Sequence, residues 1–111
     1  MAFDNTPYRN IDVQNGTSTL VRNSPGVIDN YFISNSAAAT RYIKLYNKVS
    51  AVPASDTPVL TLALPAGASA NSANLGWRFT NAISVRATVN RIDTDDTAPT
   101  TGDVIVNFGI A

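Results

Sequence analysis

The sequence contains no cysteine and no histidine. Without cysteine, disulfides, thiolate metal sites and thiol nucleophiles are all excluded. Without histidine, the chain lacks the commonest general base, the commonest metal ligand and the usual pH switch. A serine or threonine nucleophile would therefore have no histidine to activate it. These absences argue against an enzyme, and we predict no catalytic residues, no bound metal and no cofactor.

Charge is also sparse, with eight basic and eight acidic side chains in 111 residues. No cluster of lysine or arginine is present to neutralise the phosphates of a nucleic acid. No stretch approaches the roughly 20 apolar residues of a membrane span, and the first residues do not resemble a signal peptide. We therefore expect a soluble chain with no nucleic-acid or membrane partner.

Glutamate is absent, and lysine occurs only at Lys44 and Lys48, so there is little to build an exposed helix face. Threonine, valine, isoleucine, tyrosine and phenylalanine favour strands, while asparagine, aspartate and serine favour turns. Turn signals divide the chain into roughly seven or eight short strands, the spacing of a β-sandwich. We predict one all-β sandwich, of jelly-roll or immunoglobulin-like topology.

The expected domain spans residues 16–111, preceded at 1–15 by an irregular arm and the start of the first hairpin. Asn15-Gly16 is a strong hairpin signal, because both turn positions need positive φ. Asn15-Gly16-Thr17 is also a glycosylation sequon, but the turn is the favoured interpretation. We expect a kink or bulge at Asp29-Asn30, a loop at 35–40 and a loop or weak edge strand at 68–74.

The clearest alternation runs from Arg41 to Val49 and predicts a strand with Ile43 and Leu45 facing the core. Its other side would then carry three further side chains outward, which we predict to form a partner-binding face: Tyr42, Lys44 and Tyr46. Tyrosine suits such a face because its ring buries area while its hydroxyl stays hydrogen-bonded.

Three more aromatic residues are candidates for partner binding. Phe3 and Tyr8 could anchor the N-terminal arm on a neighbouring surface. Trp77 could be a platform for a sugar or a protein, although a core or sheet-edge position is the favoured interpretation. The acidic loop 93–103 could hold calcium through carboxylates, but its spacing does not fit an EF-hand, and aspartates capping a solvated turn are favoured.

The chain resembles small virion structural proteins of tailed bacteriophages over roughly residues 30–108. The resemblance rests on Arg41–Lys48, on Asp56–Gly67, on Arg78-Phe79 before an Asp/Thr-rich loop, and on Asp103–Asn107. It implies a β-sandwich that is incorporated into phage particles, on the head, neck or tail.

Within that class, capsid decoration is our first hypothesis. The protein would be made in the host cytoplasm and would sit on the outer surface of the virion. There, as a dimer or trimer, it would cement the major capsid protein lattice, where many weak copies gain from multivalency. A neck, tail or fibre module is the first alternative, and a carbohydrate-binding adhesion module that uses Trp77 is the second.

Overall fold

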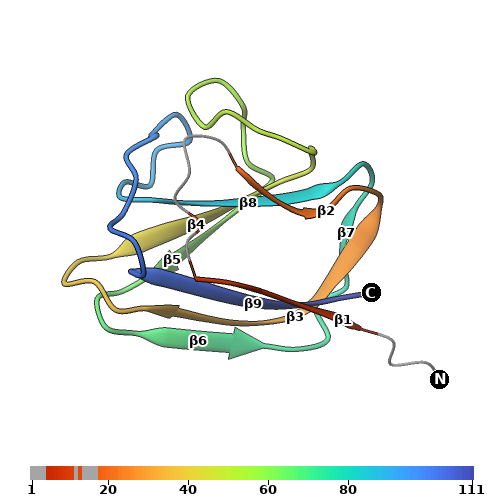
Figure 1. Cartoon of the computed structure of the whole chain (residues 1–111), viewed down its shortest axis with the longest axis horizontal. Coiled ribbons are helices and arrows are strands. Elements are labelled where there is room, and N and C mark those ends of the chain that lie inside the picture. The colour runs from red at the N-terminus through yellow and green to blue at the C-terminus, as the bar shows by residue number, and fades with distance from the viewer. Residues whose placement is uncertain (1–4, 12, 14–17) are drawn as a thin grey trace.

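The computed structural model describes residues 5–11, 13 and 18–111, which form nine strands in two antiparallel sheets (Figure 1). The strands are β1 (Thr6–Asn10), β2 (Thr19–Arg22), β3 (Gly26–Asn35), β4 (Arg41–Tyr46), β5 (Leu60–Leu64), β6 (Ser69–Ser72), β7 (Trp77–Phe79), β8 (Ile83–Thr88) and β9 (Val104–Ile110). The all-β sandwich predicted from composition and turn spacing is confirmed.

The strand order decides between the two predicted topologies. Sheet A has the order β1-β9-β3-β6, with β7 also paired to β3, and sheet B has the order β2-β8-β4-β5. The pairs β1–β9, β2–β8, β3–β6 and β4–β5 are nested, as in one long hairpin ribbon. Rolling that ribbon brings β9 beside β3 and β8 beside β4. This order is that of a jelly roll.

The core lies between the sheets and is built from the predicted alternation. Ile43 and Leu45 of β4 pair with Ala87 and Val85 of β8, and all four side chains are fully buried. Sheet A closes the core from the other side with alternate residues of β3 and β9: Ile28, Ile33, Val104, Val106, Phe108 and Ile110. The inward face is therefore confirmed for Ile43 and Leu45, but the strand ends at Tyr46, short of the predicted Val49, which is 48% exposed.

Several local expectations are also confirmed. The register between β3 and β9 shifts between Ile28 and Asn30, which is the irregularity expected at Asp29-Asn30. Residues 36–40 form a loop, and β6 is an edge strand within the stretch 68–74.

The prediction of an irregular arm is wrong for residues 6–10, which form β1 and pair with β9 along their whole length. The Tyr8 ring stacks on Phe108 with ring centroids 6.1 Å apart. Pro7 is tolerated because β1 is an edge strand, where one N–H in two has no ladder partner. Ile11 and Val13, which would belong to the strand before the predicted Asn15-Gly16 turn, do not lie in a strand. The Asn15-Gly16 hairpin and Phe3 lie outside the described residues.

Asn35, at the end of β3, ties two turns of the sandwich together. Its side chain is buried and its Nδ2 donates to the carbonyls of Ala39, Leu64 and Pro65 at 2.9, 2.9 and 3.2 Å. Its Oδ1 accepts the N–H of Ala37 at 2.9 Å. One amide thus links the β3–β4 loop to the β5–β6 turn.

We expect Asn35→Ala to lower the free energy of unfolding by about 2–4 kcal/mol, because buried carbonyls and an N–H lose their partners. Urea denaturation measures this. The control is Asn71→Ala on the exposed side of β6, which should cost within about 0.5 kcal/mol. Equal losses in the two variants would contradict the linking role of Asn35.

Candidate functional site

The outer face of sheet B is covered by the chain itself. Figure 1 shows the β4–β5 connection (47–59) and the β8–β9 connection (89–103) on the side of sheet B away from sheet A. Beneath them, Lys44 and Tyr46 of β4 and Arg86 of β8 point away from the core, yet each is 0% exposed. This face is therefore a second, polar interior.

Two buried cations hold the β8–β9 connection against the sheet. Lys44 Nζ donates to the carbonyls of Ile92 and Asp95 at 2.7 and 3.2 Å. Arg86 Nη2 donates to the Asp96 carbonyl at 3.1 Å, and Nη1 lies 2.9 Å from the Asp96 carboxylate. Burial lowers the pKa of Lys44, while the nearby carboxylate of Asp95 acts in the opposite direction. The loop replaces the water that both cations would otherwise need.

Tyr42, Lys44 and Tyr46 were predicted to form an exposed partner-binding face. This prediction is wrong for Lys44 and Tyr46, which are buried. The three side chains do share the side of β4 opposite Ile43, as the alternation required. Only Tyr42 keeps access to solvent, in a shallow hollow bordered by Thr61, Ala63 and residues 91–93. A period of two assigns each residue to a face, but it does not reveal that two long loops fold back over that face.

The other aromatic candidates pack inward. Trp77 of β7 is half-buried against the core, and its ring lies 5.9 Å from that of Tyr31 in a tilted arrangement. Tyr8 likewise packs against the core beside Phe108. A role in partner binding for Trp77 and Tyr8 stays a prediction, and each ring offers only part of its surface for it.

The acidic loop is organised by its own hydrogen bonds. The Asp95 carboxylate accepts the backbone N–H of Asn90 at 3.0 Å and the Thr97 hydroxyl at 2.9 Å. Asp103 accepts the N–H of Thr100 at 3.1 Å, and Asp96 pairs with Arg86. Within the described part of the chain, no three acidic side chains gather as metal ligands would. These bonds are those of the capped turn favoured from the sequence.

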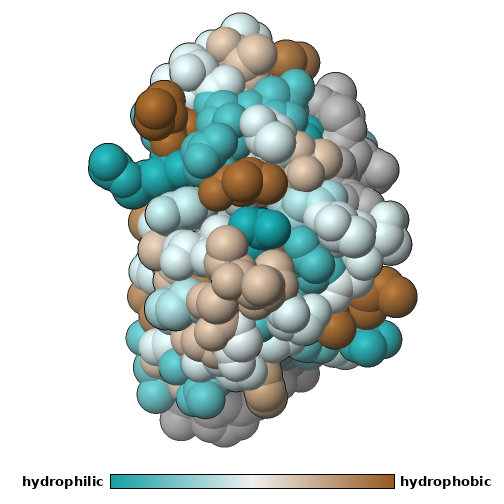
Figure 2. All heavy atoms as spheres, turned by 90° about the vertical axis from the view of Figure 1, so that its left-hand side faces the viewer, coloured by the Kyte–Doolittle hydropathy of each residue, from teal (hydrophilic) through white to brown (hydrophobic). Residues whose placement is uncertain are grey.

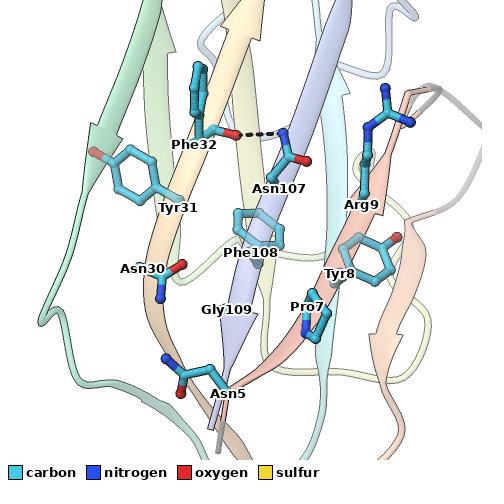
Figure 3. Close-up of a pocket in the computed structure, with 10 residues that line it drawn as sticks. All are labelled: Asn5, Pro7, Tyr8, Arg9, Asn30, Tyr31, Phe32, Asn107, Phe108 and Gly109. Atoms are coloured by element: carbon cyan, nitrogen blue, oxygen red, sulfur yellow. Dashed lines mark hydrogen bonds between the residues drawn. The ribbon is translucent and has the colours of Figure 1, made fainter. Parts of the chain in front are cut away.

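The outer face of sheet A, by contrast, is open. The register places Pro7 and Arg9 of β1, Asn107 and Gly109 of β9, and Asn30 and Phe32 of β3 on this face. These residues border a hollow of roughly 660 Å³, with Phe32 at one end and Asn5 at the other (Figure 3). Phe32 is 54% exposed, a large share for so apolar a ring.

Side-chain amides of β3 and β9 lie at the base of the hollow. Asn107 Nδ2 donates to the Phe32 carbonyl at 3.1 Å, which joins β9 to β3 beside the exposed ring. At Gly109 the Asn30 amide lies so close to the backbone that any Cβ would collide with it. Glycine is therefore required for Asn30 to lie flat across the sheet. The residues that line the hollow combine aromatic rings, amides and one charged side chain, Arg9.

Phe32 was not among the partner-binding residues predicted from the sequence. It lies in the continuous apolar run Tyr31-Phe32-Ile33, where alternation does not separate the two faces. The bulge at 29–30 further shifts the register, so counting from Ile28 gives the wrong side. Counting from Ile33 gives the right side: Ile33 is buried, so its neighbour Phe32 points outward.

The end of the sandwich that carries the β3–β4, β5–β6 and β8–β9 connections has a different character. Figure 2 shows hydrophobic atoms there in separate small spots among neutral and hydrophilic ones. This end therefore does not rival the outer face of sheet A as a docking surface. The described residues contain no helix of the length and apolarity needed to cross a bilayer.

Comparisons of the chain with protein-family models, with curated proteins and with solved structures give no match.

The buried tyrosine yields a testable pH dependence. Burial raises the pKa of Tyr46 from 10.0 to about 12, with Arg86 acting in the opposite direction. Between these values the unfolded chain loses the proton that the folded chain keeps, so this group's contribution to stability falls as pH rises. We expect Tyr46→Phe to remove that part of the alkaline loss.

The measurement is urea denaturation of the native protein and Tyr46→Phe across pH 9 to 12, the range around the titration of Tyr46. Tyr42→Phe serves as the control, because Tyr42 is only partly buried. The prediction fails if the native protein and Tyr46→Phe lose stability in parallel above pH 10.

Proposed function

We propose that the protein is a non-enzymatic structural component of a tailed-phage particle, and in particular a capsid decoration protein. In this proposal it docks on the lattice of the major capsid protein and stabilises the head. The phage resemblance over residues 30–108 supports the setting. The sparse charge and the lack of cysteine and histidine support a role in which surfaces bind and no bond is made or broken.

The unequal treatment of the two sheets is the observation that supports docking. Sheet B buries its outer face under its own loops, held by Lys44 and Arg86. Sheet A leaves its outer face bare, with Phe32 exposed beside a hollow. An aromatic ring surrounded by hydrogen-bonding amides is the usual composition of a protein-binding centre. Repetition over a symmetric shell would turn a modest single contact into firm attachment.

A second candidate uses the same face. Phe32, Asn30 and Asn107 together offer an apolar ring and amide groups, which also suit a sugar. In this case the adhesion module would bind host glycans through Phe32, since Trp77 is half-buried against the core. Docking on protein is preferred because it also accounts for the phage resemblance.

The first experiment is electron microscopy of intact particles of the phage that encodes the chain, labelled with an antibody against it. Label over the head in many copies is the expected result. Label confined to the neck or tail would keep the virion role and reject the decoration role. Unlabelled particles, together with glycan-array binding that Phe32→Ser abolishes, would replace the proposal with adhesion.

We expect Phe32→Ser to weaken binding to particles that lack the protein by about tenfold or more, because a central exposed aromatic contributes most at such interfaces. Cosedimentation with the particles measures this. The matched control is Ile92→Ser, since Ile92 is 67% exposed but lies on the loop over sheet B. Equal binding by the two variants would show that the docking surface lies elsewhere.

A further inference from the structure

Strand β5 (Leu60–Leu64) ends sheet B and has a free edge. It pairs with β4, and no other strand among the described residues pairs with it. The edge of a sheet presents unpaired N–H and C=O groups that can hydrogen-bond to another strand. None of the five residues is proline, so every N–H that faces this edge can donate.

The remaining four edge strands are less suited to pairing. β1 contains Pro7, which lacks an N–H, and the charged Arg9. β2 has four residues, ends in Arg22, and has a register shift against β8. β6 is a four-residue strand of small, mostly polar residues, and small side chains bury little area. β7 has only three residues, one of them the charged Arg78. Of the five edge strands, β5 is therefore the longest that lacks both proline and charge.

The sequence of β5 has the same pattern in both directions. It reads Leu-Thr-Leu-Ala-Leu, with Leu62 at its centre and small side chains at 61 and 63. No charged residue occurs anywhere from Thr57 to Trp77. An interface between identical copies must be self-complementary, because a two-fold axis places each patch against itself. A charged residue near that axis would meet its own like charge, and β5 has none.

We infer that β5 pairs antiparallel with β5 of a second copy, about a two-fold axis through Leu62, to form a dimer. Thr61 then lies opposite Ala63 of the second copy, and Leu60 lies opposite Leu64 of the second copy. The two four-stranded sheets B join into one continuous sheet. Beyond the strand, exposed Val59 meets Pro65 of the second copy, which extends the apolar contact.

The packing at this side of the sandwich supports a covering strand. Leu60 and Leu62 face the core but remain only partly buried, as does Ala70 on β6. Leu60 and Leu62 lie on the last strand of sheet B, so the side chains of a strand added beyond β5 would shield them further from water. Shielding apolar side chains adds a hydrophobic contribution to the backbone hydrogen bonds.

This inference does not rest on the proposed function. The dimer edge is on sheet B, whereas the docking face is on sheet A, so the two can fail separately. A dimer formed this way carries two copies of the open sheet A face.

The test is the mass of the native chain in solution, by analytical ultracentrifugation or light scattering. We expect twice the 11.8 kDa of one chain. Thr61→Lys/Ala63→Lys should be monomeric, because lysines would face lysines across the axis. Both positions are exposed, so the fold should be kept, as circular dichroism would verify. Ala63→Lys alone is the milder variant if the double change unfolds.

A complementary variant sharpens the test. Thr61→Asp/Ala63→Asp should also be monomeric alone, while an equimolar mixture of the lysine and aspartate variants should form a heterodimer. The control is Ser69→Lys/Asn71→Lys, which adds the same charge to the exposed side of β6 and should remain dimeric. A monomeric native chain, a dimeric lysine variant or a mixture that stays monomeric would each overturn the inference.

Discussion

The burial of Lys44 and Arg86 on the outer face of sheet B is the constraint on which the rest of the molecule depends. The two cations sit on neighbouring central strands and are direct cross-strand partners. Like charges in that position repel, and burial deprives both of water. The β8–β9 connection resolves this by presenting the carbonyls of residues 92, 95 and 96 and the Asp96 carboxylate. Because the loop must lie there, much of the outer face of sheet B is covered, and the hollow beside Tyr42 is the part that stays open.

The open face follows from the same arrangement. A sandwich of two sheets has two outer faces, and here one of them is occupied by the chain's own loops. The hollow on the other face is lined by an exposed phenylalanine, several amides and one arginine. This hollow depends on Gly109, where the lack of a Cβ admits the Asn30 side chain. One sheet is thus largely covered by the chain itself, while the other keeps an open outer face.

Local patterns in the sequence predicted much of the fold. The alternation at 41–46, the irregularity at Asp29-Asn30 and the loop after Asn35 each reflect nearest-neighbour geometry, which a short window of sequence contains. β1 was not predicted because the mostly polar residues Thr6–Asn10 show no alternation of apolar and polar side chains. The segment becomes a strand by pairing with the distant β9. Strand order was likewise open, since the pairing of β1 with β9 is not local.

The candidate site was harder to predict for the same reason. Tyr46 and Lys44 were assigned to the correct side of β4, but their burial depends on loops that lie up to 51 residues away in the chain. Phe32 was not predicted to be exposed because a bulge and a continuous apolar run hide which side of β3 its ring points to. Exposure is a property of what folds over a strand, and a strand's own sequence does not contain it.

The place of β9 has a consequence for how the molecule is made. β9 lies between β1 and β3, so an inner strand of sheet A comes last in chain order among the nine described strands. Sheet A cannot close until β9 has been synthesised, because β1, the first of the described strands, pairs with β9, the last of them. Such non-local pairing slows folding, because the entropy of closing a long loop is lost before contacts compensate for it. The open face of sheet A consequently forms only once β9 has joined β1 to β3.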